Sequence, residues 1–321
     1  MSGQVFAYYL HNLSPHVIRF GEGFAVHWYG LAYVLGFYCG YLLLVRFAKK
    51  GLGELKPDQV ADFITYCALF GVVLGGRIGY MLLYNFDSFV ANPLSLFKLW
   101  DGGMASHGGI AGLALFTLYF ARKHKMSWTG LGDNLVVVAP LGIFFGRMAN
   151  FINGELYGRT TDVSWAMKFP TEIHEPTFTP AASTTLPWQT FPQHSHEIVS
   201  AASQFPDGRA QLEAILHPRH PSQLYEGALE GLFLFFILYA IRMKWKNLSH
   251  GILTGLFFIL YAIGRIVSEN FREPDSSLIM GITKGQFYSV FMIVIGLLFL
   301  AWAVFFNRKN PQNPKRTPLV S

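Results

Sequence analysis

The chain has 321 residues, of which 52% are hydrophobic and only 14% are charged. An average soluble domain has about 25% charged residues, and intrinsic disorder requires few apolar residues and many charges. The composition therefore excludes a disordered chain and argues against a soluble globular protein. A net charge of +6 is compatible with nucleic-acid binding, but the distribution of the basic residues, described below, argues against it.

Seven apolar stretches are each long enough to cross about 30 Å of hydrocarbon. They predict an all-α polytopic membrane protein with seven transmembrane helices, in which residues 1–321 form one membrane-embedded domain. The segment 154–222 is rich in Pro, Thr, Ser and His, and it predicts a small irregular periplasmic head. The predicted spans are 24–46, 60–84, 105–121, 131–153, 223–241, 250–269 and 285–306.

Lys and Arg residues are distributed unequally between the two sides of the predicted spans. Fourteen of them follow the first, third, fifth and seventh spans, and eight lie on the opposite side. The positive-inside rule then places the N-terminus outside and the C-terminus in the cytoplasm. The excess positive charge reflects topology and contact with anionic lipids, so we expect no nucleic-acid partner.

Cysteine and histidine give no metal-site pattern. Cys39 and Cys67 lie in apolar stretches, which is typical of buried small side chains and not of a disulfide framework. His194 and His196 form a His-x-His pair in the predicted head. A metal site would need further ligands at suitable spacing, so the sequence predicts none.

Three arginines, Arg77, Arg147 and Arg265, lie inside predicted spans, each directly after a glycine. An Arg at mid-membrane costs ~2.5–3.5 kcal/mol on insertion scales. All three are near the outer ends of even-numbered spans and therefore at similar depth. Snorkelling to the interface would explain one such residue, but three at one level favour an anion site. Since Arg binds phosphate through a bidentate fork, a phospholipid headgroup is the first candidate ligand.

Polar residues accompany these arginines along the chain. Tyr261 and Glu269 lie four residues before and after Arg265, on the same helix face. They either position the guanidinium group or form a structural pair that lowers its cost of burial.

A second polar group, Asn150, Asn153 and Glu155, follows Arg147 where the fourth span reaches the surface. These side chains either hydrogen-bond a glycerol-like polyol or cap the end of the helix.

Glycines surround His107 in the segment 102–109, where the third span begins on the outer side. The titration range of His suits general acid–base chemistry near neutral pH, although a single His near a membrane is often structural. Tyr29 belongs to the run His27 to Gly30 at the outer end of the first span, where aromatic residues also anchor helices at the interface.

Residues 146–159, GRMANFINGELYGR, resemble the motif of the prolipoprotein diacylglyceryl transferase family over all fourteen positions. The resemblance implies a seven-span enzyme of the bacterial inner membrane. It would transfer the diacylglyceryl group of phosphatidylglycerol to the lipobox cysteine of a prolipoprotein, form a thioether and release glycerol phosphate. Membrane lipids are further implied partners, and no metal or organic cofactor is implied. Other resembling segments are HWYGL at 27–31, GGRIGYMLLYN at 75–85, WDGGMASHGG at 100–109, RHPSQLYE at 219–226 and GRIVSENFREPD at 264–275.

The resemblance also implies roles for single residues. Arg147 and Arg265 would hold the phosphate. His107 is the first candidate base for the acceptor thiol, and Glu155 is the second. The resemblance gives no role to Arg77, and the sequence leaves open whether it contacts substrate or braces a helix. The other residues implied at the headgroup site are Asn150, Asn153, Tyr29, Tyr261 and Glu269.

Two other functions fit parts of this sequence pattern, namely an intramembrane protease and a transporter. An intramembrane protease would need a Ser–His dyad, but Ser106 and His107 are neighbours in sequence and cannot form one. A transporter of anionic phospholipid or phosphate would suit three arginines at one depth. However, the two halves of the sequence show no repeat, and the inner-leaflet side lacks the polar groups that alternating access requires.

Overall fold

The computed structural model describes residues 8–21, 24–98, 102–184, 186, 191–274 and 278–309. The basic C-terminal end at 310–321 and residues 99–101, part of one family-like segment, lie outside these ranges. Helices account for most of the described chain, and the strands are short. Backbone contacts divide the protein into two compact units.

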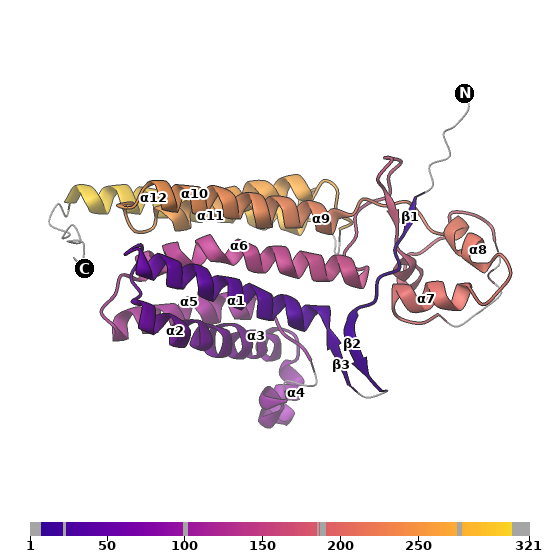
Figure 1. Ribbon diagram of the computed structural model, residues 1–321, viewed down its shortest axis with the longest axis horizontal. Coiled ribbons are helices and arrows are strands. Elements are labelled where there is room, and N and C mark those ends of the chain that lie inside the picture. Colours follow the sequence, from indigo (N-terminus) through magenta and orange to yellow (C-terminus); the bar gives the residue numbers. More distant parts are fainter. Residues whose placement is uncertain are drawn as a thin grey trace. The chain divides into compact units, whose positions relative to one another are not determined.

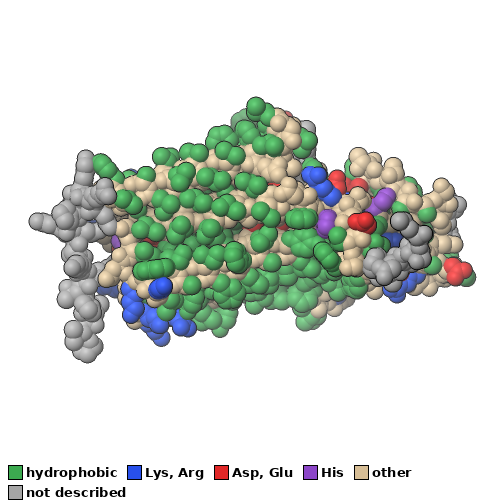
Figure 2. Space-filling view, turned by 90° about the horizontal axis from the view of Figure 1, so that it is seen from above, with side chains coloured by type: hydrophobic (Ala, Val, Ile, Leu, Met, Phe, Trp, Pro, Cys, Tyr) green, Lys and Arg blue, Asp and Glu red, His purple; other side chains and the backbone are tan. Residues whose placement is uncertain are grey.

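All seven predicted spans are helical over most of their length. Ile252–Ser268 (α11) is apolar but shorter, with 17 residues, and Ser106–Lys123 (α5) is a helix of 18 residues. Hydrophobic side chains cover most of the visible helical surface (Figure 2). The chain is therefore a mostly helical, polytopic membrane protein. Within the part of the chain that the structure describes, five helical segments are long and apolar enough to cross a membrane: Trp28–Lys49, Pro57–Leu83, Trp128–Asn153, Ser222–Lys244 and Lys284–Phe305.

The first predicted span began four residues too early. Phe24–His27 forms strand β3, which pairs antiparallel with β2 (His16–Phe20), and α1 (Trp28–Lys49) begins only at Trp28. Hydropathy alone could not separate these residues from the helix, because a short apolar strand and the first turn of an apolar helix have similar composition.

The first unit contains residues 1–36, 140–236 and 258–294. Its membrane-type segments include the start of α1, the C-terminal part of α6 (Trp128–Asn153), α9 (Ser222–Glu226) with the π-helical turn Gly227–Phe233, most of α11, and the start of α12 (Lys284–Lys309). These elements position the charged residues of the candidate site.

The segment between α6 and α9 is more regular than the sequence suggested. It carries strand β4 (Met167–Lys168), which pairs in parallel with β1 (Tyr9–Leu10), and the helices α7 (Ser195–Ala202) and α8 (Gly208–Ile215) beside β1 (Figure 1). Apolar residues at helical spacing on α7 and α8 close a small core, which the high Pro and polar content of the segment concealed. The buried core residues are Leu10, Ile198, Val199, Ala202, Leu212, Ile215 and Leu216.

The second unit contains residues 37–139, 237–257 and 295–321. In it, the π-helical turn Cys67–Leu74 links α2 (Val60–Tyr66) to α3 (Gly75–Leu83), and both the turn and α3 pack along α5. A Cβ on Gly75 would lie 2.9 Å from the Cα of Gly112, so glycine allows these helices to approach backbone to backbone. This unit also contains α4 (Phe86–Ala91), the 3₁₀ turns Pro57–Gln59 and Pro93–Phe97, most of α10 (Leu234–Lys244), and the remaining parts of α1, α6, α11 and α12.

A buried carboxylate secures the start of α11 in the second unit. Asp133 on α6 is 1% exposed and accepts hydrogen bonds from the backbone N–H groups of Gly251 and Thr254, both at 2.8 Å. The Thr254 hydroxyl donates a third bond at 2.8 Å. These contacts satisfy backbone N–H groups that the first turn of a helix leaves without an intrahelical partner.

Candidate active site

A cluster of buried charged side chains joins three helical segments of the first unit. Arg147 lies on α6, Arg265 lies on α11, and Glu226 ends α9. Nη2 of Arg147 and Nη1 of Arg265 each lie 2.7 Å from the same oxygen, Oε2 of Glu226. The Glu226 side chain is fully buried, whereas Arg147 and Arg265 are 17% and 16% exposed. One carboxylate therefore gathers two guanidinium groups, which themselves remain partly accessible.

Glu230 adds a second carboxylate one turn further along the chain, within the π-helical turn. Its oxygens lie 3.9 Å from Nη2 of Arg147 and 3.7 Å from Nη1 of Arg265. Ser268 donates a hydrogen bond of 2.7 Å to Oε1 of Glu230, and the Tyr261 hydroxyl also hydrogen-bonds Glu230. The structure thus brings Tyr261 to the two arginines through Glu230.

Arg272 and Glu269 complete the cluster. Nη1 of Arg272 lies 3.1 Å from Oε2 of Glu226, and Arg265 forms an ion pair with Glu269 one helical turn away. A Cβ on Gly285 would lie 2.5 Å from Cδ of Glu269, so only glycine leaves room for this carboxylate. Three guanidinium groups and three carboxylates balance in charge, as burial away from water demands.

No sequence prediction covered Glu226, Glu230 or Arg272. The predicted anion site contained only basic residues inside the spans, and Arg272 lies just beyond the end of α11. Glu226 and Glu230 lie four residues apart in an otherwise apolar span, which is a signal that the same cost argument would have found.

A second polar group in the same unit contains Tyr29, Asn150 and Glu155. The Tyr29 hydroxyl donates to Oε1 of Glu155, and Nδ2 of Asn150 donates to the same oxygen at 2.9 Å and to the Tyr29 hydroxyl. Burial raises the pKa of the Glu155 carboxyl above its ordinary value. Oδ1 of Asn153 is buried and has no hydrogen-bond partner among the described residues. This group therefore combines a hydrogen-bonded carboxylate with an amide acceptor that has no partner among the described residues.

Arg77 lies in the second unit and is 2% exposed. Its Nε and Nη atoms donate to five backbone carbonyls between residues 95 and 103. The acceptors are Ser95 at 2.7 Å, Lys98 at 2.8 Å, Leu96 and Gly103 at 3.2 Å, and Gly102. Since an Arg side chain has five N–H donors, this arrangement favours a brace for the segment over a contact with substrate.

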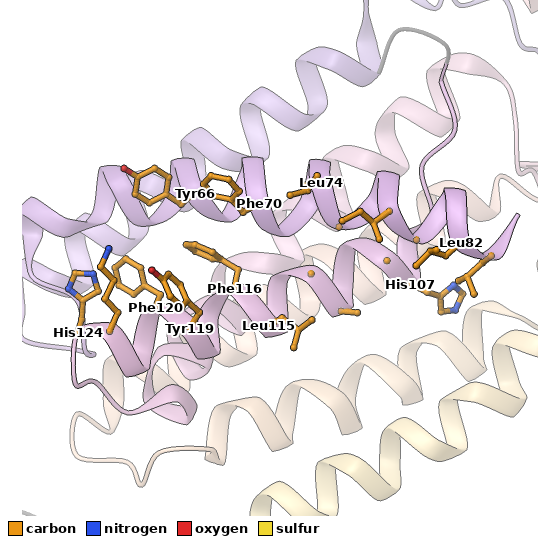
Figure 3. A pocket seen from close by; sticks show the side chains of 18 residues that line it. Tyr66, Phe70, Leu74, Leu82, His107, Leu115, Phe116, Tyr119, Phe120 and His124 are labelled. Carbon is orange, nitrogen blue, oxygen red and sulfur yellow. The ribbon is translucent and has the colours of Figure 1, made fainter. Parts of the chain in front are cut away.

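An apolar groove of about 1040 Å³ lies in the second unit between the α2–α3 segment and α5 (Figure 3). His107, the second residue of α5, lies near one end beside Leu82, and His124 lies at the other end beside Phe120. Lys123 also lines the groove. Apart from these polar residues the walls are aliphatic and aromatic, as a hydrocarbon ligand requires.

Four histidines of the first unit lie close together. His194 and His196 lie near His16 and His27, with the His16 ring centroid 4.6 Å from that of His27 and 5.6 Å from that of His194. Among the described residues, no group of three or more His, Cys, Asp or Glu side chains has the geometry to hold a metal ion.

These features define a helical membrane protein with buried arginine–carboxylate pairs and a hydrocarbon-lined groove. Residues 15–302 match the model of the family described as prolipoprotein diacylglyceryl transferase. The chain belongs to this family.

Curated relatives agree along almost the whole chain. A protein of Photorhabdus laumondii named phosphatidylglycerol–prolipoprotein diacylglyceryl transferase is 40% identical over 91% of this chain and 93% of its own length. Proteins of the same name from Serratia proteamaculans and Rhodospirillum centenum are 41% and 39% identical. They cover 90% and 96% of this chain, and 91% and 96% of their own lengths.

Proposed function

We propose that this chain transfers the diacylglyceryl group of phosphatidylglycerol to the cysteine thiol of a prolipoprotein lipobox. The new bond is a thioether between the cysteine sulfur and a glyceryl carbon. The bond that breaks joins this carbon to a phosphate oxygen, and glycerol phosphate leaves with the electron pair. The convergence of Arg147 and Arg265 on one buried position is the observation that carries this proposal, because the leaving phosphate gathers negative charge.

The proposed setting is the bacterial inner membrane. The five long apolar segments, together with α5 and α11, supply seven spans. The positive-inside rule supports a periplasmic N-terminus and a cytoplasmic C-terminus. Residues 154–222, with their small core, form the periplasmic head, and the membrane lipids surround the helices.

The guanidinium groups of Arg147 and Arg265 hold the headgroup phosphate and stabilise it as it leaves. Tyr261 and Glu269 position these groups, the first through Glu230 and the second by pairing with Arg265. The walls of the groove in the second unit are mostly apolar, so this groove suits a hydrocarbon chain.

The glycerol hydroxyls bind at the second polar group of the first unit. Asn150 and Tyr29 already share one oxygen of Glu155, and Asn153 presents an acceptor without a partner among the described residues. A polyol hydroxyl can donate to that acceptor and receive a bond from an amide, so this group orders the headgroup.

The acceptor thiol must lose its proton, since the thiolate is the reactive form of cysteine. His107 is the first candidate acceptor, because it is exposed at the end of the groove and an imidazole is a common general base. Glu155 is the second candidate, because burial raises the pKa of its carboxyl above its ordinary value, which strengthens it as a proton acceptor.

The test uses purified full-length protein, phosphatidylglycerol and a lipobox peptide, with the mass of the peptide as readout. The wild type should add a diacylglyceryl mass to the cysteine, and the folded variant Arg147→Ala should not. Equal gain with the variant would remove Arg147 as the phosphate clamp. A folded wild type that moves labelled lipid across vesicles without modifying the peptide would instead support the lipid transporter.

A further inference from the structure

The guanidinium groups of the charged cluster already have an anion between them. Oε2 of Glu226 lies 2.7 Å from Arg147, 2.7 Å from Arg265 and 3.1 Å from Arg272. A single oxygen that receives three guanidinium groups uses N–H donors of the kind that bind phosphate. The Glu226 carboxylate thus stands where a phosphate oxygen would find its donors.

The exposed fractions of the side chains show which members of the cluster a ligand can reach. Glu226 and Glu230 are fully buried, whereas Arg147 and Arg265 keep 17% and 16% of their side-chain surface exposed. The guanidinium groups are therefore the part of the cluster that an anion can reach. A bound phosphate and the Glu226 carboxylate then compete for the same N–H donors.

Charge balance shows what this competition does during turnover. Glu226, Glu230 and Glu269 already neutralise the three arginines, so the nearby carboxylates repel each negative charge that a phosphate adds. The lipid substrate is a phosphate diester with one negative charge. The released glycerol phosphate is a monoester that carries about −1.5 to −2 at pH 7. Without an opposing anion the arginines would hold the product more tightly than the substrate.

We propose that the Glu226 carboxylate competes with the headgroup phosphate for the same guanidinium groups. It holds these groups together before the lipid binds, and it displaces glycerol phosphate after the reaction. Glu226 is thus a positioning residue that acts through Arg147 and Arg265. This inference rests on the proposed function for its substrate, but the competition itself concerns only phosphate and these side chains.

The experiment compares Glu226→Gln with the wild type in detergent-purified full-length protein. Calorimetric titration with glycerol phosphate measures binding directly, without any turnover. Glu226→Gln keeps the size and an acceptor oxygen but removes the charge, so the affinity for glycerol phosphate should rise about tenfold or more. In the lipidation assay, kcat and KM for phosphatidylglycerol should fall together, because product release becomes slower.

Glu269→Gln is the matched control, because it removes the same charge from a carboxylate paired with Arg265 alone among the three arginines. A smaller rise in affinity than with Glu226→Gln is expected. Equal rises would show a general charge effect and overturn the assignment to Glu226. Unchanged or weaker binding by folded Glu226→Gln would overturn it as well.

Glu226→Asp keeps the charge but withdraws it by one methylene group, and it serves if Glu226→Gln does not fold. Its affinity for glycerol phosphate should lie above that of the wild type. An affinity at or below the wild-type value would contradict the proposal. The titration does not depend on lipidation. A wild type that binds glycerol phosphate but modifies no peptide would therefore refute the proposed function. The affinities of the Glu226 variants for glycerol phosphate would still decide whether Glu226 competes with phosphate.

Discussion

Replacing Arg77 tests whether this buried arginine is a brace or a substrate ligand. The side chain donates to five backbone carbonyls of the segment 95–103, and it is 2% exposed. Lys has three N–H donors, so Arg77→Lys loses at least two of these five bonds while it keeps the charge. At ~1–1.5 kcal/mol for each bond, the loss of stability is about 2–3 kcal/mol.

Arg77→Ala removes all five bonds and leaves the carbonyls to water where it can reach them. We expect a loss of about 5 kcal/mol or less, since hydration replaces part of what the arginine provides. The assay is thermal unfolding of the detergent-purified protein, followed by lipidation kinetics on the folded fraction. A brace predicts a midpoint lower by several degrees for Arg77→Lys, with KM for phosphatidylglycerol near the wild-type value.

The opposite pattern would refute the reasoning. If Arg77→Lys unfolds at the wild-type temperature but has a KM raised tenfold or more, Arg77 binds substrate. Lys98→Gln is a suitable control, because only the backbone carbonyl of Lys98 accepts a bond from Arg77 and its side chain can change without disturbing that bond.

Three further predictions concern other parts of the chain. Asp133→Ala should lower stability by about 3 kcal/mol, because it removes three hydrogen bonds to the start of α11. Hydrogen exchange at the backbone amides of Gly251 and Thr254 should become faster, and unchanged exchange would contradict this role of Asp133. Burial lowers the pKa of His11 from 6.5 to about 4, so the folded state binds fewer protons than the unfolded state between these values. Stability should therefore fall by up to about 3 kcal/mol as the pH drops from 6.5 to 4. His11→Phe should remove this pH dependence from acid-unfolding curves. An equal loss of stability in the variant would show that another group causes the pH dependence. His107→Gln should lower kcat by about 10²-fold or more with little change in KM, whereas a loss of that kind in Glu155→Gln alone would make Glu155 the proton acceptor.

Hydropathy predicted the helices well because each span must bury its own backbone hydrogen bonds inside the bilayer. The same measure could not see the hairpin at Phe24–His27, whose apolar residues match those of the helix that follows. It also overlooked the small core formed by α7 and α8, because short amphipathic helices are diluted by the Pro-rich and polar residues around them.

The candidate site was predictable to the extent that it depends on local spacing. The cost of burying charge identified Arg147 and Arg265, and helical spacing joined Glu269 and Tyr261 to Arg265. The structure brings these four together. The meeting of Arg147 with Glu226 could not be predicted, because contacts between different helices leave no periodic signal in a single sequence.

Arg77 shows the converse case. The sequence placed it at the same depth as the other two arginines, which left a substrate contact and a brace equally open. Its five carbonyl partners come from a segment about twenty residues away whose conformation no local pattern specifies.

The central claim is that the enzyme breaks the bond between a glyceryl carbon and a phosphate oxygen. The most direct test uses phosphatidylglycerol labelled in its headgroup glycerol, with a lipobox peptide and the purified full-length protein. We expect one labelled glycerol phosphate to be released for each thioether formed on the cysteine. Release of labelled free glycerol, or of lysolipid with an acylated peptide, would show that a different bond is broken and would contradict the proposed reaction.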